Sequence, residues 1–171
     1  GSITTRVDVK ANTTTGNITV NGNIFTSAST GDATIRLEAG NNVIVTGGMT
    51  ALGSTAADVS ASGGNIAVPG LTRARAISGA ANIVLDASST LATGGISAQG
   101  TAADVLLEGN NITTNGTVNV TGTSFANFEA FAFNNLTINN LVNVSEAGGG
   151  TASRPANGPP GASSGRPGGG G

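Results

Sequence analysis

The chain has 171 residues, of which 28 are Gly and only 9% are charged, and it contains no His, Cys, Trp or Tyr. The lack of Cys and His excludes disulfides, thiolate metal sites and imidazole-dependent catalysis. Seven basic and nine acidic residues give a net charge of -2, which is not the positive charge that nucleic-acid binding requires. No apolar run approaches the roughly 20 residues of a membrane-spanning helix. We therefore predict no cofactor, no metal site, no nucleic-acid partner and no membrane insertion.

Apolar and polar residues alternate along most of the chain, beginning near its N-terminus. Residues 6–10 (RVDVK) and 117–121 (TVNVT) are examples. A period of two is typical of half-buried β-strands, and the frequent Gly residues disfavour helices. The 33 Val, Ile and Leu residues precede Ala147, and this apolar content argues against disorder.

A motif of about 24 residues recurs six times along the chain. Each copy begins with a polar residue, usually Asn, and continues with apolar residues at alternate positions. The first apolar residues of the six copies are Ile18, Val43, Ile66, Leu91, Ile112 and Leu136. Repetition at a nearly fixed period is the sequence signature of a solenoid.

Two further sets of apolar residues repeat in phase with this motif. The pairs expected to point inward from a preceding strand are Val7/Val9, Ile35/Leu37, Val59/Ala61, Ile83/Leu85, Val105/Leu107 and Phe131/Phe133. The residues that follow the motif by five or six positions are Ile24, Met49, Leu71, Ile96, Val118 and Leu141. Each repeat is therefore predicted to contain three short strands.

The phased repeats predict an all-β fold, a right-handed parallel β-helix (β-solenoid) of about six three-stranded coils. One coil cannot bury its own apolar side chains, whereas stacked coils align equivalent positions into a continuous core. Right-handed winding is the default for parallel crossovers, and six coils at the strand spacing would span on the order of 29 Å. The alternative is a β-sandwich or barrel, which would use hairpin turns and would not need phased motifs.

The Asn at the start of the motif is predicted to have a structural role. Asn tolerates the left-handed conformation that a sharp corner can need, and stacked Asn side chains can hydrogen-bond into a ladder along the axis. The fourth copy has Thr90 instead. The alternative is glycosylation at the Asn-x-Ser/Thr triplets that begin at residues 12, 17, 111, 115, 119, 135 and 143, although a chain this rich in Asn and Thr contains such triplets by chance. The predicted ladder comprises Asn17, Asn42, Asn65, Asn111 and Asn135.

Three acidic residues follow a Leu at the end of a predicted first strand. Glu38, Asp86 and Glu108 are therefore expected at equivalent exterior positions, with Asp86 and Glu108 one coil apart. Carboxylate pairs occur in Ca²⁺ sites and in glycosidases, but solvated exterior charges are the simpler interpretation. We predict no catalytic residue here.

The remaining charged residues suggest turns and one basic spot. Asp32, Asp58 and Asp104 precede strand patterns and are interpreted as turn residues. Arg73 and Arg75 form a local basic spot, which is weak support for an acidic ligand.

Four of the five Phe residues are clustered between residues 123 and 133, and the earlier repeats have no such cluster. The first interpretation is a wider last coil or a cap over the open end of the core. The second is a contact surface for another subunit, because apolar clusters near a solenoid end mark association. The residues of this possible subunit contact are Phe125, Phe128, Phe131 and Phe133.

The sequence divides into two regions. Residues 1–146 are predicted to form the β-helix, and residues 147–171 hold four of the five Pro and no aliphatic residue larger than Ala. This composition predicts a Gly/Pro-rich extended tail or linker.

The coils resemble the β-helical shaft of filamentous-haemagglutinin-like exoproteins of bacterial two-partner secretion. The resemblance lies in the Asn- and Gly-punctuated coils, such as residues 81–87 (ANIVLDA) and 107–112 (LEGNNI), and covers roughly residues 1–146. It implies secretion to the bacterial cell surface and a role in adhesion, biofilm or surface-fibre formation. The sequence departs from that family by lacking its N-terminal secretion domain.

We therefore expect a secreted, non-enzymatic adhesin shaft or fibre subunit. Its expected partners are further copies of itself stacked end to end, neighbouring domains of a longer chain, or a host or cell-surface glycan or protein. The alternatives are a glycan-binding β-helix module and a polysaccharide-acting enzyme. An enzyme of that class needs a groove of clustered Asp, Arg or Lys, and this chain has one Lys and no Asp cluster.

Overall fold

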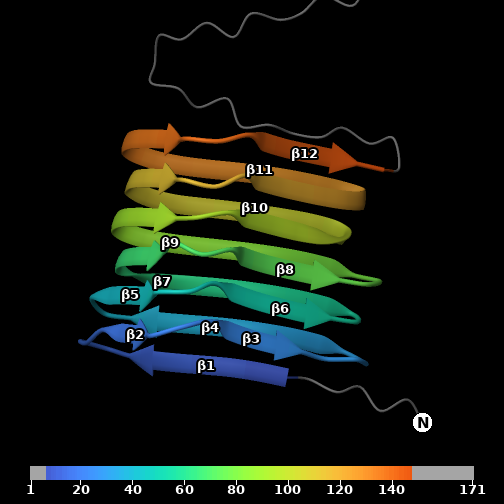
Figure 1. The fold of residues 1–171 in the computed structure, drawn as a ribbon, viewed down its shortest axis with the longest axis horizontal. Helices are drawn as coiled ribbons and strands as arrows, with labels where there is room; N and C mark the ends of the chain where they lie inside the picture. Colours follow the sequence, from blue (N-terminus) through green and yellow to red (C-terminus); the bar gives the residue numbers. More distant parts are fainter. Residues whose placement is uncertain (1–6, 148–171) are drawn as a thin grey trace, which may run out of the picture.

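The computed structural model describes residues 7–147, and this part of the chain consists of β-strands and connecting turns without a helix (Figure 1). Residues 148–171 of the predicted tail lie outside the described residues. Its twelve strands are β1 (Val7–Thr13), β2 (Ile18–Val20), β3 (Ile24–Ser27), β4 (Asp32–Ala39), β5 (Asn42–Val45), β6 (Met49–Gly53), β7 (Ala56–Val68), β8 (Thr72–Ala76), β9 (Ala80–Thr93), β10 (Ile96–Thr114), β11 (Val118–Ile138) and β12 (Val142–Glu146). All strand pairs are parallel. The predicted β-solenoid is confirmed.

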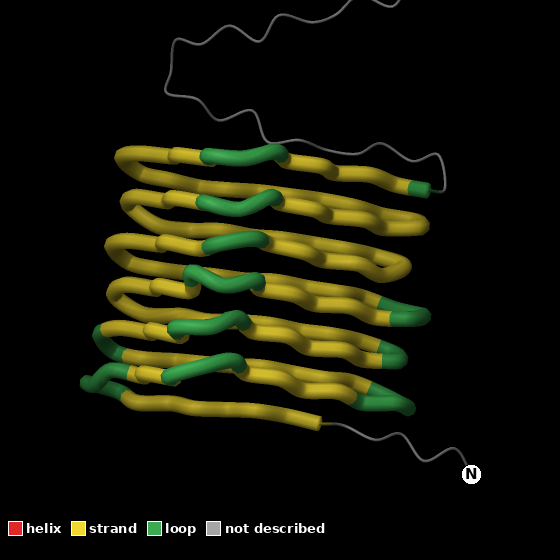
Figure 2. Tube along the Cα trace, viewed as in Figure 1, coloured by secondary structure: helices red, strands yellow, loops and turns green. Residues whose placement is uncertain are grey.

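The chain winds through three faces in each of six coils. The first face contains β1, β4 and the early parts of β7 and β9, and it continues into β10 and β11. The second face begins with β2 and β5, and the third contains β3, β6, β8, the start of β10, the start of β11 and β12. Figure 2 shows the connecting loops stacked above one another at the edges of the faces.

The 24-residue motif sets the register of the second face as predicted. Its six leading apolar residues form one row through the solenoid, in the order Ile18, Val43, Ile66, Leu91, Ile112 and Leu136. The four residues of this row in the middle coils are at most 1% exposed. Stacked coils therefore supply the burial that one coil cannot.

Small residues fill the inner positions where the wall bends into the first face. From the second coil to the sixth, one row of the first face consists of fully buried alanines: Ala33, Ala57, Ala81, Ala103 and Ala126. The neighbouring inner row contains Ile35, Val59, Ile83, Val105 and Phe128. The high Ala content thus reflects a narrow interior rather than helical structure.

Two of the predicted third-face residues lie one position away from the core row. The row contains Thr72 and Val142 in place of Leu71 and Leu141. Leu71 is 46% exposed and Leu141 is 60% exposed. The prediction was wrong here because alternation restarts after each corner, so an apolar residue in the loop resembles the first residue of the strand.

The predicted inward pairs are also displaced in the first and last coils. Val9 is opposite Ile35, so the pair in the first coil is Val9/Ala11 rather than Val7/Val9. In the last coil Phe128 and Ala130 are inward, whereas Phe131 and Phe133 are exposed. An aromatic-rich strand has apolar residues on both sides, and this removes the alternation that fixes the register.

The corners do not use Asn in a left-handed conformation. No non-Gly residue between 7 and 147 has a positive φ, whereas Gly22 and Gly31 both have a φ of 131°. Glycine tolerates this conformation because it has no Cβ. The recurrent Asn residues therefore act through their side chains, and the predicted left-handed role was wrong.

Candidate functional site

The predicted Asn ladder lies on the outside of the second face. Asn42 Nδ2 donates a hydrogen bond to Asn17 Oδ1 at 2.8 Å, and Asn65 Nδ2 donates to Asn42 Oδ1 at 2.8 Å. Asn135 Nδ2 donates to Asn111 Oδ1 at 2.9 Å. Thr90 occupies the same row between Asn65 and Asn111 and interrupts it. In every bond the later coil donates to the earlier one, so the ladder has a direction.

Further ladders that we did not predict run parallel to this one. Asn139 Nδ2 donates to Asn115 Oδ1, and Asn143 Nδ2 donates to Asn119 Oδ1, both at 2.9 Å. A spacing of 24 residues between two Asn residues was the available signal. These bonds connect the last two coils on either side of a corner.

Two aspartates interpreted as turn residues are part of a ladder on the first face instead. Asn82 Nδ2 donates to Asp58 Oδ1 at 2.8 Å, and Asn127 Nδ2 donates to Asp104 Oδ1 at 3.0 Å. Asp58 and Asp104 lie inside β7 and β10, so the turn assignment was wrong for both. Asp32 begins β4. Asp and Asn alternate in this row because an amide can donate to the carboxylate beside it.

The first face carries most of the negative charge. All nine acidic residues are described, and only Glu146 in β12 lies outside this face. The eight carboxylates of the first face are Asp8, Asp32, Glu38, Asp58, Asp86, Asp104, Glu108 and Glu129. The cations described on it, Lys10 and Arg36, both lie in the first two coils, so the face becomes more acidic toward the C-terminal end.

Glu38, Asp86 and Glu108 occupy one exterior row, as the sequence predicted. Glu38 is opposite Ser62, Ser62 is opposite Asp86, and Asp86 is opposite Glu108. Like charges directly opposite each other on parallel strands are destabilising. In residues 7–147 no group of three or more acidic side chains is arranged to hold a metal ion.

Glu38 has a specific partner on its own strand. Arg36 donates from Nε to Glu38 Oε1 at 2.7 Å and forms an ion pair with the same carboxylate. Asn12 Nδ2 donates to Glu38 Oε2 at 2.7 Å. The Arg36 hydrogen bond, followed by that from Asn12, holds the pKa of Glu38 below its ordinary value of 4.5.

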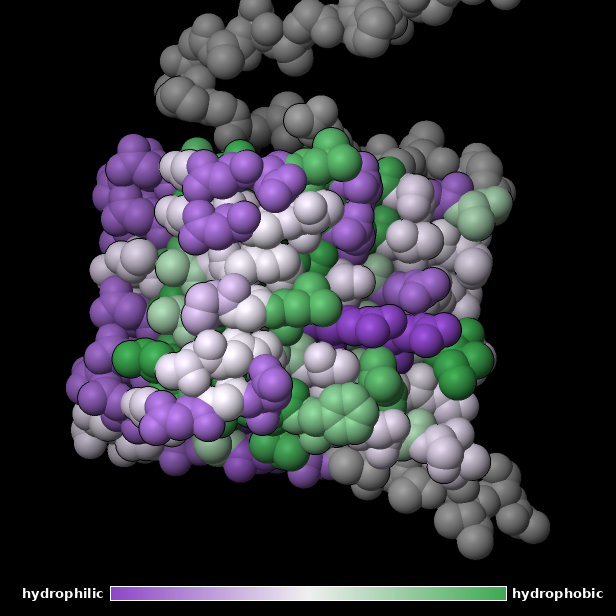
Figure 3. Space-filling model, in the orientation of Figure 1, coloured by the Kyte–Doolittle hydropathy of each residue, from purple (hydrophilic) through white to green (hydrophobic). Residues whose placement is uncertain are grey.

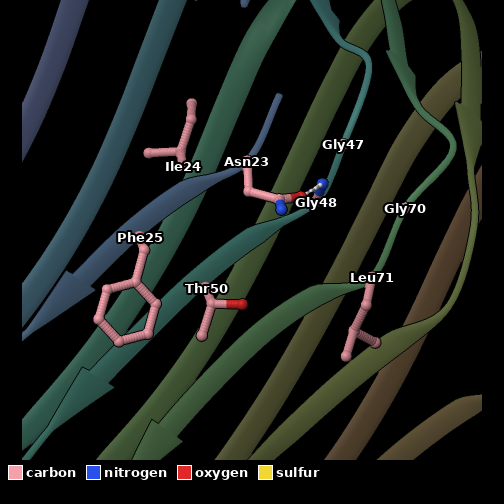
Figure 4. Close-up of a pocket in the computed structure, with 8 residues that line it drawn as sticks. All are labelled: Asn23, Ile24, Phe25, Gly47, Gly48, Thr50, Gly70 and Leu71. Carbon is pink, nitrogen blue, oxygen red and sulfur yellow. Dashed lines mark hydrogen bonds between the residues drawn. The ribbon is translucent and has the colours of Figure 1, made fainter. Parts of the chain in front are cut away.

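A shallow hollow of about 360 Å³ lies at the corner between the second and third faces (Figure 4). Phe25, which is 61% exposed, and Leu71 provide apolar surface. Thr50 lies in β6, between the β3 strand of Phe25 and the β8 strand that follows Leu71. The Asn23 side chain accepts a hydrogen bond from the Gly48 amide at 2.7 Å. A side chain at Gly47, Gly48 or Gly70 would collide with a neighbouring coil, so these glycines allow the coils to stack closely at this corner.

The two arginines predicted to form a basic spot lie on the third face near this hollow. Arg73 is opposite Thr50, and Arg75 is opposite Leu52. A second hollow, of about 290 Å³, lies on the first face beside Arg36, Glu38 and Asp86. The surface in view in Figure 3 mixes polar and apolar residues over the faces that contain β2, β5 and β3.

The Phe residues of the possible subunit contact are not all on the surface. Phe128 is 1% exposed and fills the core of the last coil, so it adds no exposed side-chain surface to such a contact in the single copy. Phe125 and Phe131 are each 45% exposed, and Phe133 is 87% exposed. Of the four residues of the predicted contact, these three are the ones with exposed side chains.

The chain matches no family model, no curated protein and no solved structure. The residues that the structure describes contain no helix long and apolar enough to cross a membrane. The class that the fold defines is the parallel β-solenoid repeat protein.

Proposed function

We propose that this chain is a non-enzymatic structural element, a rigid shaft or fibre subunit of a bacterial surface adhesin or filament. The observation that carries the proposal is the stack of six coils held in one register on three faces. Repeat proteins of this kind are quasi-one-dimensional, because each coil contacts only its neighbours. Such a protein acts as a spacer whose length is set by the number of coils.

The outer surface supports a structural role over a catalytic one. The amides of Asn17, Asn42 and Asn65 point outward, where they bond to each other from coil to coil. Asp58 and Asp104 are likewise used in bonds between coils. The bonds that these two carboxylates accept join neighbouring coils, which supports a structural role for them.

The location at the cell surface can be tested with antibodies raised against the purified chain. We expect them to label intact cells that produce the protein, with the label extending outward from the envelope. Labelling that requires permeabilised cells would contradict the proposed location. Cells that do not produce the protein serve as the control.

A second candidate function is glycan binding at the hollow beside Phe25. Exposed aromatic rings stack on sugar faces, and most ligand sites combine apolar surface with a few placed polar groups. Phe25, Asn23 and Thr50 provide this combination. A glycan array would test it: binding that is lost in F25A but retained in F133A supports this site, and equal binding of both variants contradicts it.

A further inference from the structure

We propose that the two ends of the solenoid are complementary, and that a second copy of this chain stacks on the last coil in one specific register. This inference rests on the proposed function and names the partner and the contacts. In this register Phe128 of one copy is opposite Val9 of the next, because both residues belong to the same inner row. The first coil of the next copy then continues the sheet as a seventh coil.

The end coils offer unfilled sheet edges to such a partner. Within residues 7–147, β1 pairs only with β4 and β12 pairs only with β11. On the second and third faces, the inward apolar residues of the end coils are only partly buried, unlike those of the middle coils, whereas Ala126, Phe128 and Ala130 on the first face of the last coil are at most 1% exposed. The partly buried residues include Ala11, Ile18, Val20 and Ile24 in the first coil and Leu136, Ile138, Val142 and Val144 in the last. Edges of this kind pair with further strands.

The apolar rows of the two ends match across the second and third faces. In the proposed register Leu136 is opposite Ile18, Ile138 is opposite Val20, and Val142 is opposite Ile24. Six positions separate the second-face and third-face rows at both ends, from Leu136 to Val142 and from Ile18 to Ile24. The corner between these faces therefore has the same length on both sides of the interface.

The Asn ladder is complementary at the two ends. In the described residues Asn135 donates to Asn111 while its Oδ1 accepts no bond, and Asn17 accepts from Asn42 while its Nδ2 donates none. Since later coils donate to earlier ones, Asn17 of the next copy can donate to Asn135. Asn139 and Asn21 lie at the same relative positions in a second row. The direction of the ladder permits head-to-tail stacking and disfavours joining two like ends.

Opposite charges meet in the same register on the first face. Glu129 in the last coil and Lys10 in the first coil belong to one exterior row, which also contains Arg36, Ser60, Val84 and Leu106. Stacking brings Lys10 of one copy beside Glu129 of the other. Complementary charges of this kind fix register and suppress wrong pairings.

Because the chain contains no Cys, single cysteines can report this register in the full-length protein. Adjacent parallel strands place opposite residues about 4.8 Å apart, within the Cα separation of a disulfide. We expect a mixture of K10C and E129C to form a disulfide-linked heterodimer under mild oxidation. The matched control is V84C mixed with E129C, because Val84 lies in the same row in the middle of the face.

The charge contribution is tested by sedimentation velocity on variants without cysteine. We expect E129K to weaken association at least several-fold and the double variant K10E/E129K to restore it. Circular dichroism identifies any variant that fails to fold. Association of E129K at wild-type strength contradicts the ion pair.

Three results overturn the proposal. They are a chain that remains monomeric at all concentrations, E129C homodimers in place of the mixed species, and equal cross-linking of the V84C control. Surface labelling of intact cells is independent of all three results, so the proposed shaft function can stand when this register fails.

Discussion

Threonine hydroxyls lie on both sides of the coil wall, and their energetic effect depends on the side. Thr72 is fully buried in the third-face inner row, between Met49 and Ile96. Its hydroxyl has no hydrogen-bond partner among the described residues. A buried polar group without a partner costs free energy that an apolar side chain of the same shape does not.

We therefore expect T72V to raise the free energy of unfolding by about 1 kcal/mol. The control is T19V, at an exposed position of the second face, which should change stability by less than about 0.5 kcal/mol. Urea unfolding followed by circular dichroism measures both. A T72V variant less stable than the wild type would show that the hydroxyl has an unrecognised partner.

Glu38 provides a prediction for pH dependence. Its pKa lies below the ordinary value of 4.5 because Arg36 and then Asn12 stabilise the carboxylate. A lowered pKa in the folded state gives stability that is present above the unfolded value, near 4.5, and lost as the pH falls through the folded value. NMR titration should show the pKa of Glu38 rising toward 4.5 in R36Q and unchanged in R75Q. No change in R36Q would contradict the assigned cause.

At the scale of the strand, the row that a residue occupies on its face determines whether its side chain is buried in the core, bonded to a neighbouring coil or exposed. The Asn motif allowed the register of the second face to be predicted, because Asn and the following apolar residue recur together at five of the six coils. Leu71 and Leu141 could not be placed, since loop residues near a corner carry no periodicity. The alternating Asp and Asn row was missed because hydrogen bonds between residues about 24 positions apart have no local signal.

Thr90 interrupts the Asn ladder, and a substitution to Asn should complete it. T90N would place an amide between Asn65 and Asn111. We expect it to raise the free energy of unfolding by about 1 kcal/mol, the net value of a typical hydrogen bond. T90A is the control, because it removes the hydroxyl without adding an amide. Equal stabilities of T90N and T90A would mean that the ladder adds nothing at this coil.

The register of the Phe-rich strand leads us to expect opposite effects of substitutions at Phe128 and Phe133. F128A removes a side chain from the core of the last coil and should lower the free energy of unfolding by about 3 kcal/mol. F133A removes an 87% exposed side chain and should have an effect below about 0.5 kcal/mol. Thermal or urea unfolding distinguishes the two, and a larger effect of F133A would restore the original assignment of Phe131 and Phe133 to the core.

At the scale of the whole molecule, the solenoid combines an acidic first face, a second face with an amide ladder and a third face with two arginines. The row of Glu38, Asp86 and Glu108 was predicted, but the presence of eight of the nine acidic residues on one face was not, because they are far apart in the sequence and occupy several rows of that face. The stack of about six three-stranded coils was predicted from the repeat. Both ends of the rod present the same three rows, and this allows one copy to continue the next.

Electron microscopy of the full-length protein over a range of concentrations tests the central claim most directly, that this is a shaft extended by stacked coils. Six coils at about 4.8 Å each give an axial repeat on the order of 29 Å. We expect unbranched filaments that lengthen with concentration and show this repeat together with a 4.8 Å axial spacing. Uniform particles one subunit long at every concentration, or filaments without the 4.8 Å axial spacing, would contradict the account.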